Sequence, residues 1–148
     1  MCCLFGFIDY SHKLTCKQRL RLLSTLSTAC EARGTDATGI SYVLGGRQVI
    51  YKRPLPAHLM WYRVPRSLSI VMGHTRMATQ GSELVNTNNH PFPGVAGQTH
   101  FSLAHNGILT NGKTLRKKYK LPATKVETDS YVAVQLLEQY GQINFDSL

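Results

Sequence analysis

The chain has 148 residues, of which 43% are hydrophobic, and its formal net charge at pH 7 is +9. This length and composition suit one globular domain with its own core. The longest apolar runs, such as Leu4 to Ile8, fall far short of the roughly 20 residues of a spanning helix, and no basic segment opens the chain, so we expect no membrane anchor, no secretion and a cytoplasmic location.

The first elements are predicted to be a strand and a helix. Residues 2–9 are apolar and aromatic, which favours a buried strand that fixes residue 2 in the core. From Thr15 to Arg33 the pattern is helical, because Thr15 and Gln18 can form a capping box and Gly34 supplies a stop. The apolar stripe of this helix comprises Cys16, Leu20, Leu23, Leu26, Ser27 and Cys30.

The middle of the chain is predicted to be β-rich. Segments 38–44 and 47–52 flank Gly45-Gly46, which can supply the positive φ angles of a two-residue hairpin turn. Residues 54–65, bracketed by prolines, predict an irregular or single-turn helical stretch. Residues 67–76 and 101–105 predict strands, separated by a long loop at 79–99, and a loop of this length in a small domain commonly carries function.

A last helix is predicted to begin at a cap formed by Thr128 or Asp129 and to end at Gly141. Its apolar face is formed by Val132, Ala133, Leu136, Leu137 and Tyr140. No internal repeat or linker divides the chain, so we expect one α+β domain over residues 1–148.

The four cysteines, at positions 2, 3, 16 and 30, do not suggest a disulfide framework or a metal site. Cys2 and Cys3 are adjacent, so they do not easily bridge each other, and on a strand their side chains point to opposite faces. No paired C-x-x-C and H-x-x-x-H segments occur. We therefore expect a reducing compartment, no metal and no cofactor.

Basic residues are concentrated in segments 47–66 and 113–120. Such a run can bind nucleic acid, although a solvated helix face is its more common role. No aromatic recognition motif accompanies residues 113–120. Nucleic-acid binding is therefore the least favoured of the functions considered.

Cys2 is a candidate nucleophile. Met1 before a small residue is normally excised, and the α-amine then exposed has a reference pKa of about 8. Such an amine can accept the proton of its own thiol, as the general base of an N-terminal nucleophile does. Position alone, however, favours a buried structural cysteine.

Five ordered segments reverse that preference. They are RGTDATGI at 33–40, GHTRMATQG at 73–81, NHPF at 89–92, HNGI at 105–108 and ETDS at 127–130. Each resembles a motif of the class II glutamine amidotransferases, which are N-terminal-nucleophile (Ntn) hydrolases. The resemblance runs from Cys2 to about Tyr140, and it is closest to the glutaminase domains of glucosamine-6-phosphate synthase and amidophosphoribosyltransferase.

This resemblance implies hydrolysis of the side-chain amide of L-glutamine, with Cys2 as the nucleophile. It implies that Asn106 and the backbone N–H of Gly107 form an oxyanion hole. It also implies that Arg76 binds the substrate α-carboxylate and that Asp129 binds the α-ammonium group, which suit a guanidinium fork and a carboxylate. Each of these residues also has a plainer explanation when it is taken singly. Arg76 could belong to a surface ion pair, Asn106-Gly107 could form a hairpin turn, and Asp129 could cap a helix.

Three more residues in these motifs, Arg33, Thr79 and His90, are implied to shape the substrate pocket rather than to break bonds. His74 and His105 are expected to be structural, because the α-amine already provides the base. A synthase domain or subunit that accepts the ammonia is the implied partner.

The implied fold is an αββα sandwich of two antiparallel sheets flanked by helices. Family domains are considerably longer, so we expect a truncated or minimal domain that lacks C-terminal strands and has open sheet edges. Cys3 stands where the family has glycine, and Met77 and Gln80 replace a tryptophan and a histidine. These departures leave open a catalytically weak or inactive subunit with a regulatory role.

Overall fold

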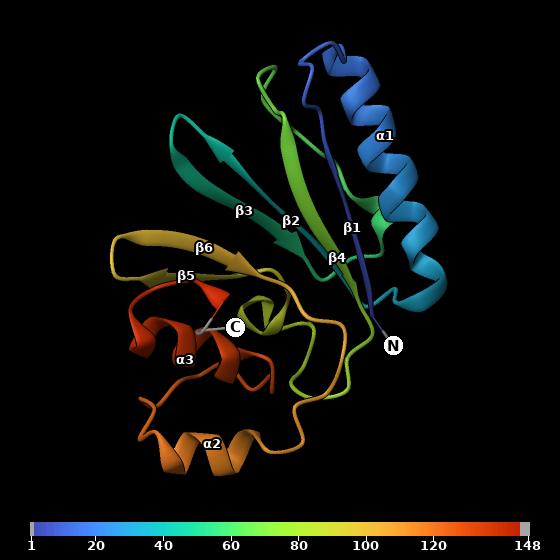
Figure 1. The fold of residues 1–148 in the computed structure, drawn as a ribbon. Coiled ribbons are helices and arrows are strands. Elements are labelled where there is room, and N and C mark those ends of the chain that lie inside the picture. Colours follow the sequence, from blue (N-terminus) through green and yellow to red (C-terminus); the bar gives the residue numbers. More distant parts are fainter. Residues whose placement is uncertain (1, 146–148) are drawn as a thin grey trace.

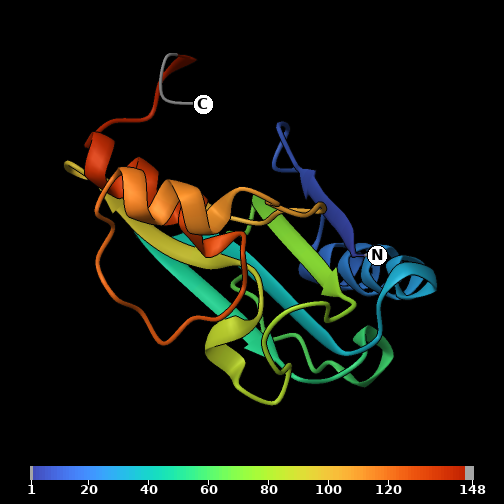
Figure 2. The same ribbon diagram turned by 90° about the horizontal axis from the view of Figure 1, so that it is seen from below.

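Two antiparallel sheets lie between helices in the computed structural model, which describes residues 2–145 (Figures 1 and 2). One face of the larger sheet is covered by α1, and the smaller sheet and α3 lie beyond its other face. The larger sheet, sheet A, has the order β1 (Cys3–Ile8), β4 (Ile70–Arg76), β2 (Ala37–Leu44) and β3 (Arg47–Arg53). The smaller one, sheet B, pairs β5 (Phe92–Ala96) with β6 (Thr99–Leu103). The predicted αββα sandwich is confirmed.

Helix α1 (Cys16–Ala29) begins at the predicted capping box. The backbone N–H of Gln18 donates to Thr15 Oγ1 at 3.3 Å, and that of Thr15 donates to Gln18 Oε1 at 2.8 Å. The chain then tightens into a single 3-10 turn, η1 (Cys30–Arg33), before Gly34. The helical prediction is therefore correct, with its last turn in a different helical form.

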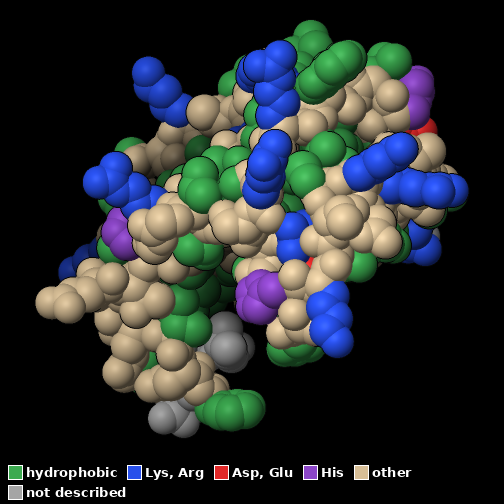
Figure 3. Space-filling model, turned by 90° about the horizontal axis from the view of Figure 1, so that it is seen from above, with side chains coloured by type: hydrophobic (Ala, Val, Ile, Leu, Met, Phe, Trp, Pro, Cys, Tyr) green, Lys and Arg blue, Asp and Glu red, His purple; other side chains and the backbone are tan. Residues whose placement is uncertain are grey.

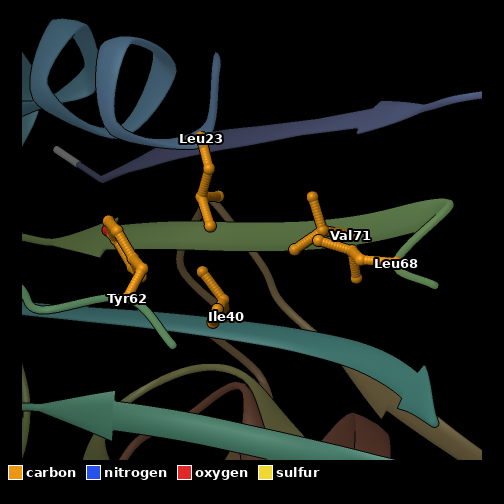
Figure 4. Close-up of a cluster of buried hydrophobic side chains, with 5 residues drawn as sticks. All are labelled: Leu23, Ile40, Tyr62, Leu68 and Val71. Atoms are coloured by element: carbon orange, nitrogen blue, oxygen red, sulfur yellow. The ribbon is translucent and has the colours of Figure 1, made fainter. Parts of the chain in front are cut away.

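The core of this half of the molecule lies between α1 and sheet A (Figure 4). Its buried members are Leu23, Ile40, Tyr62, Leu68 and Val71. Beside it, Arg19 Nη2 lies 2.9 Å from Asp9 Oδ2, and both side chains are almost fully buried. The sequence pattern did not reveal this ion pair, because Arg19 reads as a polar position next to the apolar stripe.

The β2–β3 hairpin is also confirmed. Gly45 and Gly46 have φ values of +56° and +75°, and Leu44 is paired with Arg47 across the turn. The stretch that follows contains a single 3-10 turn, η2 (Ala57–Leu59), and Trp61 is exposed. Local turn chemistry thus determines this part of the fold.

The prediction of one loop over residues 79–99 is wrong. The segment contains a 3-10 turn, η3 (Asn86–Asn88), a cis peptide bond between His90 and Pro91, and strand β5. Strand β5 includes Pro93 and Gly94, which are both rare inside strands, so its alternating pattern could not be recognised.

Helix α3 (Tyr131–Tyr140) ends at Gly141, whose φ of +80° gives the predicted left-handed cap. The predicted N-terminal cap is wrong, because the cap is Ser130 and its side chain makes no capping bond. Thr128 and Asp129 instead bind distant backbone, donating to Asn88 O and accepting from Leu109 N. The buried face includes Val134, which the prediction omitted, whereas Tyr140 is half exposed.

The basic run falls on helix α2 (Gly112–Lys118) and its C-terminal flank, and most of its lysines are exposed. Figure 3 shows lysine and arginine side chains spread over one face of the molecule. Among residues 2–145, no helix is long and apolar enough to cross a membrane.

Candidate active site

Cys2 lies just before β1, beside the end of β4. Its Sγ atom donates to Met77 O at 3.6 Å, and its carbonyl oxygen accepts from Arg33 Nε at 3.2 Å. The side chain is partly exposed, so the prediction that residue 2 is fixed in the core is wrong. The position at the strand end leaves the thiol open to a ligand. Excision of Met1 concerns a residue outside the described range.

Arg76, at the end of β4, is buried, with 2% of its surface exposed. Its Nη1 atom donates to Asn89 Oδ1 at 2.7 Å, and Nη2 donates to Gly81 O at 2.8 Å and to Gln80 O. These contacts exclude the alternative of a surface ion pair. They fix the plane of the guanidinium group against the loop that follows β4.

Opposite charges surround Arg76. Burial lowers the pKa of its guanidinium group, and electrostatic interactions with Cys2, Glu83, Asp36 and Asp129 oppose that shift. The guanidinium group therefore lies within electrostatic reach of Cys2 and of the Asp129 carboxylate. These are three of the residues selected from the sequence motifs.

The segment at 33–40 supports the end of β4. Gly34 is packed so closely that a Cβ atom there would lie 2.5 Å from the Arg76 carbonyl carbon. Asp36 accepts from the backbone N–H of Ala78 at 2.7 Å, and its own N–H donates to Arg76 O at 3.0 Å. The motif thus holds residues 76–78 in place, a role for Asp36 that the sequence analysis did not assign.

Asp129 joins the loop after β6 to the start of α3. Its Oδ2 atom accepts from the backbone N–H of Leu109 at 2.5 Å, and Oδ1 accepts from Ser130 N at 2.8 Å. Asn106 and Gly107 precede Leu109 on this loop, and both are exposed. The chain continues from them into α2 rather than into a paired strand, so they do not form a hairpin turn.

Two histidines stack behind the site. The ring centroids of His74 and His90 are 4.3 Å apart, and both residues are buried. Burial, followed by the charges around them, lowers the pKa of His74 to about 4 and that of His90 to about 2. The rings are therefore neutral at neutral pH. Both ring nitrogens of His90 lack a hydrogen-bond partner within residues 2–145.

The neighbouring His105 connects the loop after β6 with β4. Its carbonyl oxygen lies 3.2 Å from His74 Nε2, and its Nδ1 atom lies 2.9 Å from Ser130 Oγ. His74 is paired with Leu4 on β1. The loop that carries Asn106 is thereby anchored to the strands next to Cys2.

The remaining candidate positions are less enclosed. Thr79 and Gln80 are exposed on the loop after β4, and 45% of the Met77 surface is exposed. Cys3 Sγ donates to Leu4 O at 3.7 Å, and Cys30 Sγ donates to the same oxygen at 3.8 Å. All four cysteines are free thiols. Of the three positions that differ from the family, Met77 and Gln80 thus lie at the surface, and Cys3 lies between β1 and η1.

A cavity of about 560 Å³ lies apart from Cys2, between sheet A and α3. Strand β3, the η3 turn and β5 form most of its wall, including Lys52 and Phe92. None of the residues lining it is a cysteine.

Comparisons with known proteins agree with this arrangement. The chain is 36% identical over 112 residues to the glutamine–fructose-6-phosphate aminotransferase of Bacillus anthracis, a match that covers 74% of this chain and 18% of that protein. The same enzyme from Geobacillus kaustophilus is 32% identical over 143 residues, covering 95% and 22%. That from Staphylococcus epidermidis is 30% identical over 146 residues, covering 96% and 23%. No family model matches the chain.

A solved structure matches the fold. It is the glutamine phosphoribosylpyrophosphate amidotransferase of B. subtilis in complex with ADP and GMP, with a TM-score of 0.65 and 20% sequence identity. The match covers 97% of this chain and 30% of that chain. Fold and sequence together define an Ntn-hydrolase domain with a cysteine at its N-terminal end.

The chain belongs to the class II glutamine amidotransferases. It spans only about a fifth of the length of the curated relatives that it matches, between 18% and 23%.

Proposed function

We propose that this domain hydrolyses the side-chain amide of L-glutamine to glutamate and ammonia, with Cys2 as the nucleophile. The observation that carries the proposal is the Cys2 thiol bonded to Met77 O, next to the buried Arg76 guanidinium group, on which Asp129 acts as an opposite charge. A free amino acid presents one carboxylate and one ammonium group. A guanidinium group and a carboxylate beside a thiol match those charges.

The reaction begins when the α-amine of Cys2, after removal of Met1, accepts the thiol proton. The sulfur attacks Cδ of glutamine, and the resulting oxyanion is bound by the Asn106 side chain and the Gly107 N–H. The C–N bond then breaks, the amine returns its proton to the leaving ammonia, and a γ-glutamyl thioester remains. Water attacks the thioester, which releases glutamate and restores the thiol. Each oxyanion donor contributes about 3 to 4 kcal/mol to such a step.

Substrate binding is assigned to the charged groups around the thiol. Arg76 receives the α-carboxylate, which competes with the Gln80 and Gly81 carbonyl oxygens for Nη2. Asp129 receives the α-ammonium group. Arg33, Thr79 and His90 shape the surrounding pocket, Arg33 through its bond to the Cys2 carbonyl oxygen. No metal or cofactor is required by this chemistry.

The ammonia is passed to an acceptor. Relatives of this chain are named for glutamine and fructose 6-phosphate together, and they are several times longer. We infer that residues 1–148 form one glutaminase domain that works with a synthase domain or subunit, in the cytoplasm. A basic nucleic-acid-binding module, the least favoured alternative, has no support from the relatives.

An inactive regulatory subunit is the competing reading, and the engaged state of Arg76 Nη2 is the observation in its favour. Glutamate release by the purified protein separates the two. We expect release that is abolished in Cys2→Ala and retained in Cys3→Ala, the neighbouring thiol. Equal release by wild type and Cys2→Ala would reject the proposed nucleophile, and no release by processed wild-type protein would favour the inactive subunit.

A further inference from the structure

Lys52 is far from Cys2 in sequence, yet its side chain reaches from the edge strand β3 to the loop before β5. Its Nζ atom donates to Pro91 O at 3.1 Å and to Asn89 O. The same atom lies 5.1 Å from the centroid of the Phe92 ring. One ammonium group therefore holds the backbone on both sides of His90.

Asn89 links Lys52 to the candidate substrate site. Asn89, whose carbonyl oxygen binds Lys52, accepts from Arg76 Nη1 through its side-chain oxygen at 2.7 Å. Asn89 is fully buried, and its Nδ2 atom donates to Glu83 O at 2.7 Å. A shift of residue 89 would thus move an acceptor of the Arg76 guanidinium group.

A second contact joins η3 to the backbone of Lys52. Asn86 Nδ2 donates to the backbone oxygen of Lys52 at 3.0 Å. Strand β3 and the 86–91 segment are therefore tied together by backbone and side chain at the same residue. Removal of the ammonium group would leave the carbonyl oxygens of Asn89 and Pro91 without this donor.

The placement of the Lys52 ammonium group near the Arg76 guanidinium group is energetically unfavourable. Burial, followed by the nearby charge of Arg76, lowers the pKa of Lys52 to about 8. An apolar side chain of similar length would avoid both costs. Groups whose pKa is perturbed in this way concentrate at functional sites.

We propose that Lys52 is a positioning residue of the glutamine site, which holds Asn89 and Pro91 and thereby fixes the Arg76 guanidinium group for the substrate carboxylate. It does not touch the reacting atoms. The expected effect on glutamine binding rests on the proposed function. The anchoring of the loop by Lys52 rests on the loop contacts alone.

The kinetic test compares Lys52→Met with Lys52→Arg and with Lys17→Met, which removes an exposed lysine of α1. Because the α-carboxylate is bound equally in the ground and transition states, we expect Lys52→Met to raise KM for glutamine about tenfold, with kcat within about threefold of wild type. Lys52→Arg, which keeps two donors, restores most of the affinity, and Lys17→Met behaves as wild type. An unchanged KM in folded Lys52→Met would overturn the kinetic part.

Amide hydrogen exchange tests the structural part without any turnover. In Lys52→Met and in Lys52→Arg, exchange at residues 80–92 is compared with exchange in α1. We expect faster exchange at 80–92 in Lys52→Met, little change in Lys52→Arg, and no change in α1. Equal exchange at 80–92 in all proteins would refute the inference even if glutamine is hydrolysed. Faster exchange in a protein whose wild type releases no glutamate would instead reject the proposed function and keep Lys52 as an anchor of the loop.

Discussion

Asp129 combines two tasks at one side chain, because it binds the loop after β6 and carries the charge assigned to the substrate ammonium group. Asp129→Asn keeps an oxygen for the Leu109 N–H but removes the charge. A hydrogen bond to a charged group is worth about 1.5 to 3 kcal/mol, so we expect KM for glutamine to rise about 10- to 100-fold. Steady-state glutamate release measures this change.

Glu127→Gln provides the matched control for that substitution. Glu127 lies two residues away and binds Asn88 Nδ2 at 2.9 Å rather than the proposed substrate. The KM of Glu127→Gln for glutamine should stay within about twofold of wild type, since this exposed carboxylate is bound to Asn88 and is assigned no contact with the substrate. Similar losses in the two variants would show that Asp129 acts through the general charge of the loop.

His74 and His90 make the fold sensitive to acid. Their folded-state pKa values, about 4 and about 2, lie below the unfolded value of about 6.5, so the unfolded chain binds more protons as pH falls below 6.5. The stability present above pH 6.5 is therefore lost on acidification. Each histidine contributes about 2 kcal/mol of loss by pH 5, or about 4 kcal/mol together.

His90→Phe isolates one of these contributions. The replacement ring fits between His74 and Phe92 without ring nitrogens that lack partners. Urea unfolding at pH 7.5 and pH 5 should show a pH-dependent loss about 2 kcal/mol smaller than in wild type. An identical loss in both proteins would mean that His90 does not titrate on unfolding in this range.

At the scale of elements, Gly34, which follows η1, lies in close contact with the end of β4. A Cβ atom at Gly34 would lie 2.5 Å from Arg76 backbone, so the two segments must separate in Gly34→Ala. We expect a loss of about 2 to 4 kcal/mol in the free energy of unfolding, together with weaker glutamine binding. Denaturant unfolding and steady-state kinetics measure the two effects.

Gly112→Ala is the control for that change. A Cβ atom at Gly112 meets Val132 at 3.5 Å, an ordinary contact, and the residue begins α2. Alanine there should leave stability unchanged or raise it by up to about 1 kcal/mol. A comparable loss in both alanine variants would assign the effect to glycine replacement in general rather than to the Gly34 contact.

The elements that could be predicted from sequence are those with a local cause. Thr15 and Gln18 cap α1 within one turn, and Gly45-Gly46 supply the angles of their own hairpin. Strand β5 was missed because Pro93 obscures its pattern. The cap of α3 was misplaced because Asp129 binds Leu109, a partner that only the tertiary fold brings near.

At the scale of the whole molecule, the site residues also divide into those that a sequence motif reveals and those that only the tertiary fold reveals. The motifs selected Cys2, Arg76 and Asp129, and in the fold Arg76 lies within electrostatic reach of the other two. Lys52 carried no motif, since its contacts join β3 to a loop many residues later. A positioning residue of this kind becomes visible only when the two sheets are packed.

The net charge of +9 lies mostly outside the proposed site. Lys117 and Lys118 are exposed on α2, so their reversal to glutamate should leave kcat and KM for glutamine within about twofold of wild type, because exposed charges are screened beyond about 10 Å. Steady-state kinetics at 0.15 M salt measures this. A larger effect would indicate that α2 takes part in substrate binding.

The central claim, that Cys2 is a working N-terminal nucleophile, is tested most directly by intact mass after reaction with the glutamine analogue 6-diazo-5-oxo-norleucine. We expect loss of Met1 and a single adduct, located on Cys2 by peptide mapping and blocked by excess glutamine. Processed protein that remains unlabelled, or an adduct on Cys3 instead, would contradict it.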